Sequence, residues 1–274
     1  MFKIPAKDGI WEINGPQVMG IINSTTDSFY EASRVNKAHL AVEIAEKYIQ
    51  DGASILDIGG QSTRPGAVIH STHQEVLNIV PIIEAIRAQY PSVLISIDTF
   101  NSEVALAALQ AGANIVNDIS CGTFDAKMYK VVADHNAGYI GMHLTGDLET
   151  MHSIPSRINI VADLLAYFEE KKKILSSFGI NNWVIDPGFG FGKSIEENFT
   201  LVKKLQQFST LALPILLGVS RKSSIYKTLS ISANEALNGT TVVNTVGLLN
   251  GASILRVHDV KEAKQIIDLL PYIS

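Results

Sequence analysis

The chain has 274 residues, of which 46% are hydrophobic and 18% charged, and its formal net charge is −5 at pH 7. This length suits one α/β barrel, and the net negative charge argues against a general surface for nucleic acid. The single cysteine, Cys121, excludes an internal disulfide and a cysteine-rich zinc site. Charged residues and Pro5 stand where a signal peptide would need an apolar run, and no segment reaches the roughly 18 apolar residues of a membrane span. We therefore expect a cytoplasmic protein without nucleic-acid or membrane partners.

The predicted elements alternate regularly after a short N-terminal hairpin over residues 4–13. Eight apolar runs predict strands: Val18–Ile22, Ile55–Ile58, Leu94–Ile97, Ile115–Ile119, Tyr139–His143, Trp183–Ile185, Ile215–Val219 and Ile254–Val257. Between these runs, apolar residues recur at helical spacing on faces that include Leu40, Val76, Val104, Leu164, Leu201 and Ile266. The spacing of the strand starts fits βα units rather than a solenoid of shorter repeats.

Residues that begin and end helices support this alternation. Asn101 is placed to cap the third predicted helix, and Gly52, Gly112 and Gly179 follow the first, third and fifth. Eight strands alternating with helices indicate a TIM (β/α)8 barrel. A doubly wound open sheet is the alternative, because strand order cannot be read from a sequence. Since no linker or break in composition divides the chain, we predict a single domain over residues 1–274, with the short hairpin at its N-terminus.

Polar residues stand near the carboxyl end of every predicted strand, which is where the active site of a TIM barrel lies. In strand order they are Asn23, Asp57, Asp98, Asn117 with Asp118, His143, Asp186, Ser220–Ser223, and Arg256 with His258. Any one of them could be a helix cap or a paired buried group. Packing alone, however, would place Val, Ile or Leu at all eight positions. The sequence therefore predicts a functional site at this rim.

Two kinds of chemistry are available at the predicted rim. Asp98, Asn117 and Asp186 offer carboxylate and amide groups that suit the N–H groups and carbonyl of a flat heterocycle. Cationic donors that suit phosphate oxygens come from Arg64, Lys222, Arg256 and His258. Asn23 offers a neutral oxygen to Mg²⁺, an ion that commonly accompanies diphosphate. This combination favours the transfer of a heterocyclic group with the departure of pyrophosphate.

The glycine-rich segment Gly188–Ser194 resembles a phosphate-binding P-loop but departs from its pattern. A P-loop needs a glycine five places before Gly192, where this chain has Pro187. A dinucleotide-binding fingerprint would need its last glycine at position 193, which is lysine. We interpret the segment as a flexible lip after the sixth strand.

Eight short segments, spread over about residues 17–262, carry the most specific patterns in the chain. In order, they are MGIINSTTDSF, LDIGGQSTRPGA, SIDTF, NIVNDIS, MHL, IDPGFGFGK, LLGVSRKS and LRVHDV. Together they resemble the successive motifs of the dihydropteroate synthase family. The resemblance implies a TIM-barrel transferase of folate biosynthesis (EC 2.5.1.15), which condenses (7,8-dihydropterin-6-yl)methyl diphosphate with 4-aminobenzoate to give 7,8-dihydropteroate and diphosphate. It also implies bound Mg²⁺, inhibition by sulfonamides and a homodimer formed through the late helices.

The resemblance further implies roles for individual residues. The pterin diphosphate would be bound by Thr63, Asp98, Asn117, Asp186, Lys222, Arg256, Val257 and His258. The 4-aminobenzoate would be bound by Arg64, Pro65, Phe191, Lys222 and Ser223. The metal ligand would be Asn23, and the residues of a closing first loop would be Thr25, Asp27, Ser28 and Phe29. The groups that act on the reacting atoms would be Lys222, Asp186, Asp98 and Arg256.

Two stretches need separate interpretation. The first loop departs from the family pattern at Ser24 and Thr26 and lacks a Gly-rich turn, which we expect to affect loop closure rather than the ligand wall. In the second stretch, Asp57 is interpreted as a supporting acid that orients Arg64 or Asn23. Gly59 and Gly60, which follow it, are interpreted as a hinge for the loop that carries Thr63, Arg64 and Pro65.

Two other functions share part of this pattern. A methyltetrahydrofolate-dependent corrinoid methyltransferase domain would use the same pterin wall, but it has no use for diphosphate-binding residues. A non-catalytic paralogue that binds pterin is supported only by the altered first loop.

For the synthase, we expect the C–O bond to diphosphate to break early, because the electron-rich pterin spreads the positive charge left on its exocyclic methylene. No covalent enzyme nucleophile is then needed.

Overall fold

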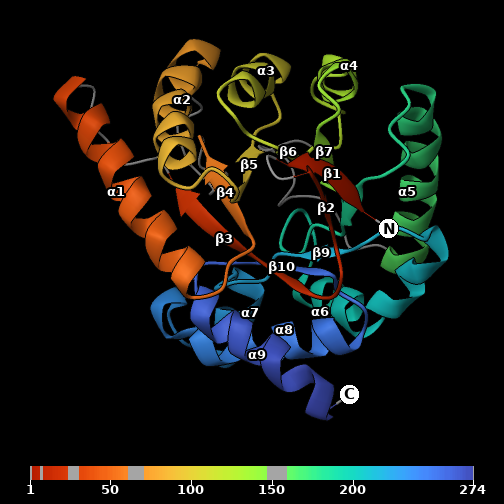
Figure 1. The fold of residues 1–274 in the computed structure, drawn as a ribbon. Helices are drawn as coiled ribbons and strands as arrows, with labels where there is room; N and C mark the ends of the chain where they lie inside the picture. The colour runs from red at the N-terminus through yellow and green to blue at the C-terminus, as the bar shows by residue number, and fades with distance from the viewer. Residues whose placement is uncertain (1, 7–8, 24–30, 61–70, 147–158, 274) are drawn as a thin grey trace.

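A computed structural model describes residues 2–6, 9–23, 31–60, 71–146 and 159–273 of the chain. Eight parallel strands form a barrel surrounded by helices, and an antiparallel hairpin lies at its N-terminal end (Figure 1). The hairpin strands are β1 (Lys3–Ala6) and β2 (Gly9–Glu12). The barrel strands are β3 (Gln17–Asn23), β4 (Ile55–Gly59), β5 (Leu94–Asp98), β6 (Ile115–Asp118), β7 (Gly138–Met142), β8 (Val184–Asp186), β9 (Leu216–Leu217) and β10 (Ile254–Val257).

The order of the strands confirms the predicted barrel. The sheet runs β8-β7-β6-β5-β4-β3-β10-β9, and each strand is parallel to its neighbours. A parallel bridge between Ile185 and Ile215 joins the two edges of this sheet. The Ile185 N–H also donates to the Pro214 carbonyl at 3.0 Å. The sheet therefore closes on itself, which excludes the doubly wound open sheet.

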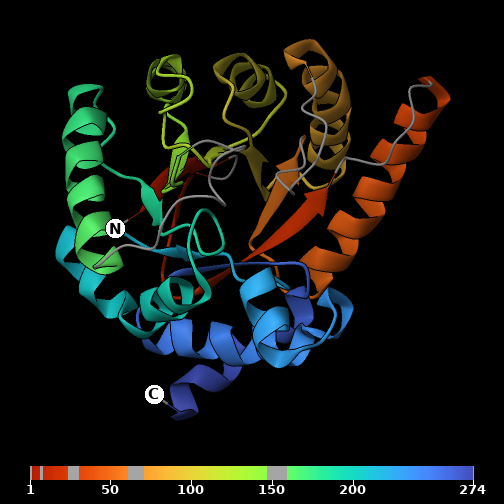
Figure 2. The same cartoon turned by 180° about the vertical axis from the view of Figure 1, so that it is seen from behind.

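Helices cover the outside of the barrel (Figures 1 and 2). They are α1 (Glu31–Gln50), α2 (Thr72–Gln89), α3 (Ser102–Gln110), α4 (Lys127–Asp134), α5 (Ile160–Ser177), α6 (Ile195–Lys203), α7 (Ser223–Leu229), α8 (Leu237–Leu249) and α9 (Val260–Ile273), with 3₁₀ turns at Leu205–Leu211 and Ala233–Glu235. The predicted cap at Asn101 is confirmed, because its side chain accepts from the backbone N–H groups of Glu103 and Val104. Apolar spacing does not predict α4, α7 or α8. The first two are short, and α8 carries Thr, Asn and Gly among its apolar residues. None of the helices within the described ranges is long and apolar enough to cross a bilayer.

Alternate residues of each strand face the barrel interior, so the interior is built in layers. The layer nearest the amino ends is apolar, with one residue from each strand: Met19, Ile55, Leu94, Ile115, Ile140, Val184, Leu216 and Ile254. Phe2 and Ile4 of the hairpin pack against this layer and are buried with it. The hairpin therefore covers the amino end of the barrel and leaves the carboxyl ends of the strands for a ligand.

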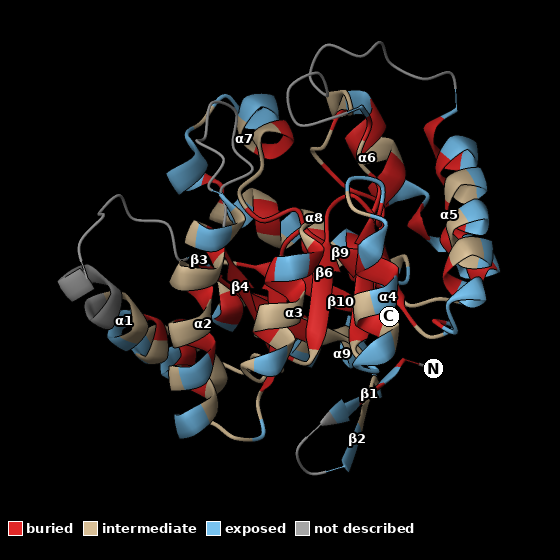
Figure 3. Ribbon diagram, turned by 90° about the horizontal axis from the view of Figure 1, so that it is seen from above, coloured by how far each residue is buried: buried red, intermediate tan, exposed pale blue. Residues whose placement is uncertain are grey.

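The next interior layer is mostly polar. It lies two residues further along each strand and consists of Ile21, Asp57, Ser96, Asn117, Met142, Asp186, Gly218 and Arg256. The residues between the two layers, such as Leu56, Val116 and Leu255, face outward into the large core shared by strands and helices. Figure 3 shows this buried centre, with exposed residues on the outer helices. Charged groups are costly to bury unless they are paired. A charged layer above an apolar one therefore marks the functional end of the barrel.

Candidate active site

Arg256, in the polar layer, lies between the carboxylates of Asp57 in the same layer and of Asp98 at the end of β5. Its Nε donates to Asp57 Oδ2 at 2.6 Å, and its Nη2 donates to Asp98 Oδ2 at 2.6 Å. Asp57 Oδ2 also accepts from Asn117 Nδ2 at 3.2 Å. Asp57 is completely buried, so its charge depends on these donors. Within the described ranges, Asp57 therefore orients Arg256 and Asn117 rather than the predicted partner Asn23.

The charges in this network shift one another's pKa values. Burial acts to lower the pKa of Arg256, but Asp57 and Asp98 outweigh it, so the pKa is raised and the guanidinium stays charged. Burial raises the pKa of Asp98 to about 7, against the opposing effect of Arg256. A ligand that presents N–H groups or positive charge to Asp98 would favour its ionised form. The network is therefore suited to a ligand of that kind.

Asp186 and Lys222 form a second charged group at the rim. Asp186 Oδ1 accepts from the Gly188 N–H at 2.7 Å, which holds the carboxylate at the end of β8. Lys222 Nζ donates to the Phe189 carbonyl and lies 4.4 Å from the centroid of the Phe191 ring. Burial raises the pKa of Asp186 and lowers that of Lys222 to about 8, and each group partly offsets the shift of the other. Two neighbouring groups whose pKa values are shifted by burial are typical of an active site.

A glycine separates the two charged groups. Gly218 follows β9, and a Cβ atom there would lie 3.8 Å from Arg256 Cβ and 3.9 Å from Asp186 Oδ2. Every other strand supplies a side chain to this layer. The missing side chain at Gly218 therefore leaves the guanidinium and the carboxylate accessible to a common ligand.

The comparisons with known proteins agree with this site. The chain matches the pterin binding enzyme family over residues 19–258. Dihydropteroate synthase from Synechocystis sp. is 40% identical over 252 residues, which are 91% of this chain and 87% of that protein. The Escherichia coli K12 dihydropteroate synthase is 37% identical over 262 residues, which are 95% of this chain and 92% of that protein. The chain belongs to the dihydropteroate synthase family.

Solved structures of dihydropteroate synthases share the whole fold. The Xanthomonas albilineans dihydropteroate synthase with 4-aminobenzoic acid superposes with a TM-score of 0.89 at 32% identity, covering 99% of this chain and 97% of that chain. The Yersinia pestis enzyme in a sulfonamide drug complex also gives a TM-score of 0.89 at 32% identity, covering 98% of each chain. The enzyme is accordingly a transferase of folate biosynthesis, as the sequence motifs predict.

The structure places the other predicted synthase residues in different ways. Ser220 Oγ accepts from the His258 backbone N–H at 3.2 Å and lies 3.0 Å from its Nδ1, which orients the imidazole. The Val257 side chain is buried in the outer core, so only its backbone can reach a ligand at the rim. Asn23 is exposed at the end of β3, and Ser223 begins α7.

Several predicted residues of the synthase site lie outside the described residues. They are Thr63, Arg64 and Pro65, and the first-loop residues Thr25, Asp27, Ser28 and Phe29. Gly60, interpreted as a hinge, is described and packs closely on α2. A Cβ atom there would lie 2.6 Å from Glu75 Cγ and 2.8 Å from Ile79 Cγ2. This close approach alone explains a glycine at position 60.

The glycine-rich segment is held by its own lysine. Lys193 Nζ donates to the Gly188 carbonyl at 2.9 Å and to the Phe191 carbonyl at 3.1 Å. It also lies within 3.2 Å of the His143 carbonyl and 3.1 Å of its Nδ1. A P-loop lysine would instead reach for phosphate. In this structure Lys193 bonds to the protein instead, and these bonds tie together a segment that the sequence suggests to be a flexible lip.

Lys193 and Asn198 are not predicted as site residues from the sequence, although the pattern around Asn198 carries one signal. Asn198 stands three and four residues before Leu201 and Val202, on the buried face of α6. A polar residue at such a position needs partners inside the protein. Asn198 is indeed completely buried.

Proposed function

We propose that the residues around Arg256 and Lys222 carry out the condensation of the pterin diphosphate with 4-aminobenzoate. The observation that supports this most directly is the Asp57–Arg256–Asp98 network, with Asn117 attached to it and Asp186 in the same layer. It offers acceptors for a heterocycle beside cations for a leaving group. Both lie at the end of the barrel that the N-terminal hairpin does not cover.

The pterin ring would bind to Asp98, Asn117 and Asp186. Carboxylate oxygens accept from the N–H groups of the pyrimidine portion, and the amide of Asn117 supplies a donor for a ring heteroatom. Asp186 Oδ1 accepts from the Gly188 N–H, and this bond fixes the orientation of the carboxylate. Its Oδ2 can then accept from the ligand. Lys222 donates to the pterin as well. Because burial disfavours the charged forms of Asp98 and Asp186, both gain from a ligand that becomes cationic.

The 4-aminobenzoate would bind against Phe191 and the start of α7, with Lys222 and Ser223 beside it. The Phe191 ring and the Lys222 ammonium already face each other. The dihydropteroate synthase from Xanthomonas albilineans has been solved with 4-aminobenzoic acid, and again with 7,8-dihydropteroate. Arg64 and Pro65 complete this proposed subsite from the loop after β4.

The diphosphate would be bound by Arg256, His258 and Thr63, with the backbone of Val257. Within the described ranges, no group of three His, Cys, Asp or Glu side chains is placed to hold a metal ion. Asn23, exposed at the carboxyl end of β3, offers one neutral oxygen, which fits an ion that takes its remaining ligands from phosphate and water. We therefore propose Asn23 as the protein ligand of Mg²⁺, which when bound would neutralise charge on the departing diphosphate.

In this mechanism the C–O bond between the pterin methylene and diphosphate breaks, and its electron pair leaves with the diphosphate. Asp98 and Asp186 stabilise the positive charge that develops on the pterin, while Arg256 and His258 stabilise the leaving group. The amine nitrogen of 4-aminobenzoate uses its lone pair to form the new C–N bond and then loses a proton. Positioning and electrostatics are sufficient, so no covalent intermediate with the enzyme is required.

The test supplies purified enzyme with the pterin diphosphate, 4-aminobenzoate and Mg²⁺. We expect stoichiometric release of pyrophosphate and dihydropteroate, and much slower release when 4-aminobenzoate is omitted. A non-catalytic paralogue would bind the pterin and form neither product, which would overturn the proposal.

We also propose that the enzyme acts in the cytoplasm, since its substrates are small and soluble.

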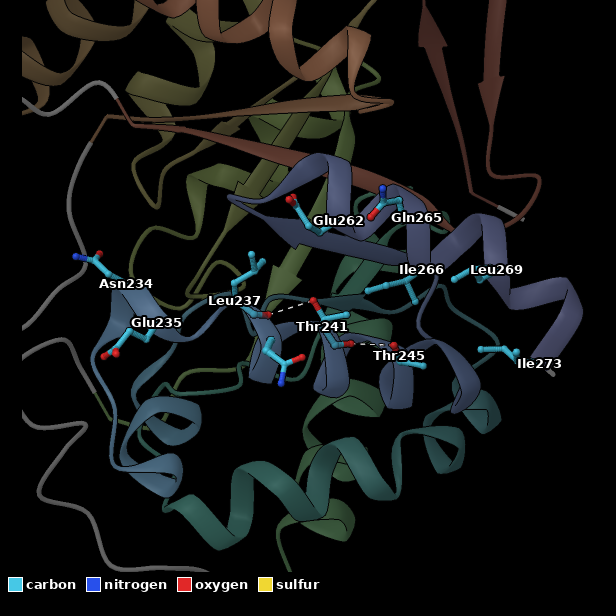
Figure 4. Close-up of a pocket in the computed structure, with 11 residues that line it drawn as sticks. Asn234, Glu235, Leu237, Thr241, Thr245, Glu262, Gln265, Ile266, Leu269 and Ile273 are labelled. Atoms are coloured by element: carbon cyan, nitrogen blue, oxygen red, sulfur yellow. Dashed lines mark hydrogen bonds between the residues drawn. The ribbon is translucent and has the colours of Figure 1, made fainter.

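A homodimer through the late helices is also proposed. Exposed apolar side chains gather on the helices near the C-terminus: Leu229, Val242, Val246, Leu249, Leu269, Tyr272 and Ile273. A pocket of about 650 Å³ adjoins this surface. Figure 4 shows its lining, with Leu237, Thr241 and Thr245 of α8 facing Ile266, Leu269 and Ile273 of α9. An apolar surface of this kind is typical of an interface between subunits.

Replacing Val246 with aspartate should convert the dimer to monomer. The two-fold axis would place two new carboxylates in the interface, and burying them weakens association by about a hundredfold or more. Light scattering coupled to size exclusion measures the mass at micromolar concentration. Ile10→Asp is the control, because Ile10 is also an exposed apolar residue but lies on the N-terminal hairpin. A Val246→Asp protein that stays dimeric would contradict the assignment of this surface.

A further inference from the structure

One buried amide connects two of the segments assigned to 4-aminobenzoate. Asn198 of α6 is fully buried, and its Oδ1 accepts from the Gly190 N–H at 2.7 Å. Its Nδ2 donates to the Lys193 carbonyl at 3.2 Å and to Ser224 Oγ at 2.9 Å. Gly190 and Lys193 belong to the loop after β8, whereas Ser224 belongs to the first turn of α7. A single side chain therefore ties the two segments to each other.

These bonds lie next to the residues that would touch the substrate. Gly190 immediately precedes Phe191, and Ser224 immediately follows Ser223. Lys222 Nζ lies 4.4 Å from the Phe191 ring, so this contact spans the two segments that Asn198 joins. Any change in their separation would alter the space between Phe191, Lys222 and Ser223.

The chain has little freedom to absorb such a change locally. Gly190 has a φ of +85°, and a Cβ atom there would lie 3.0 Å from Lys222 Cδ. Lys193 Nζ holds the loop to its own carbonyls at Gly188 and Phe191. The loop is therefore held together internally by Lys193, while Asn198 and the bond from Lys222 Nζ to the Phe189 carbonyl fix its position relative to α7.

Only an amide of this size suits the position. Aspartate would accept from Gly190 but has no donor for the Lys193 carbonyl when ionised. An apolar residue would leave the Gly190 N–H and the Lys193 carbonyl without their partner in a buried site, which is unfavourable. Binding sites lose activity when supporting residues allow shifts of about an ångström.

We propose that Asn198 is a positioning residue that sets the geometry of the 4-aminobenzoate subsite, an inference that rests on the proposed function of Phe191 and Ser223. It touches neither substrate. Its effect is transmitted through Gly190 to Phe191 and through Ser224 to Ser223. In the pterin wall, Asp98 and Asn117 lie on β5 and β6, away from Asn198. Asp186 is held by the Gly188 N–H, and its carboxylate is not bonded to Asn198.

The experiment compares steady-state kinetics of the intact enzyme with those of Asn198→Ala and Ser224→Ala. We expect Asn198→Ala to raise KM for 4-aminobenzoate by about tenfold and to change KM for the pterin diphosphate by less than about twofold. Ser224→Ala, which removes only one of the three partners, should raise the same KM by a smaller factor. This split between the two substrates is not expected from general loosening of the protein, which would affect both.

Asn250→Ala is the matched control. Asn250 Nδ2 donates to the Val202 carbonyl at 3.0 Å, so it also anchors α6 through a side-chain amide, but at the end of the helix away from the site. We expect both of its KM values to match those of the intact enzyme.

Absence of turnover by the intact enzyme would mean that the proposed function fails. The role of Asn198 would be overturned if the intact enzyme turns over but Asn198→Ala leaves both KM values unchanged. It would also be overturned if Asn198→Ala raises the KM values for the two substrates by the same factor. If Asn198→Ala does not fold, the same comparison of the two KM values in Ser224→Ala tests the proposal.

Discussion

Replacing Lys222 or Asp186 with alanine is expected to abolish dihydropteroate formation while the barrel stays folded. Both groups lie at the rim, where burial disfavours their charged forms, so the folded state does not depend on either charge. The pterin cation loses a stabilising carboxylate in one case and its adjacent donor in the other. A loss of about a thousandfold in kcat/KM is expected. Product formation and thermal unfolding, measured on the same preparations, check both halves of this result.

The pH dependence provides a second measure of the same group. Burial lowers the pKa of Lys222 to about 8, so its ammonium loses its proton as the pH rises through that value. Since kcat/KM reports the free enzyme, it should fall above about pH 8. A profile that stays flat to pH 10, or full turnover by either alanine variant, would argue against these assignments.

Replacing Asp57 with asparagine should lower both activity and stability. Asp57 accepts from Arg256 Nε at 2.6 Å and is completely buried, so asparagine leaves the guanidinium with Asp98 as its remaining carboxylate partner. Breaking a buried ion pair on one side costs about 3 kcal/mol. An Arg256 that turns away from its place would reduce kcat/KM for the pterin diphosphate by about a hundredfold. Denaturant unfolding and initial rates measure the two effects.

Asp118→Asn is a suitable control for that experiment. Asp118 is also completely buried, on β6, and its carboxylate accepts from Ser120, Gly122 and Tyr139 rather than from Arg256. Its replacement should lower stability but change kcat/KM for the pterin diphosphate far less. Equal losses of kcat/KM in the two variants would show that Asp57 acts through general stability and not through Arg256.

Much of the fold could be predicted because local patterns report on it directly. Strands buried on both faces are continuous apolar runs, so all eight were recognisable, and the cap at Asn101 was visible from its residue type. Helix α8 could not be recognised from the sequence, because Thr, Asn and Gly interrupt its apolar face. Strand order also lay beyond the sequence, because closure depends on Ile185 meeting Ile215 across the ends of the sheet.

The sequence by itself determined the family, the eight strands and the acidic and basic residues near their carboxyl ends, because motif spacing and strand periodicity are properties of the chain alone. Only the tertiary structure decided how those residues are paired. Asp57 and Arg256 are 199 positions apart and meet only because β10 returns to lie beside β3, which itself pairs with β4. The same holds for Asn198, whose amide meets Ser224 only when α6 and α7 pack together. Partners this distant in sequence are chosen by packing, so their roles could be assigned only once the barrel had closed.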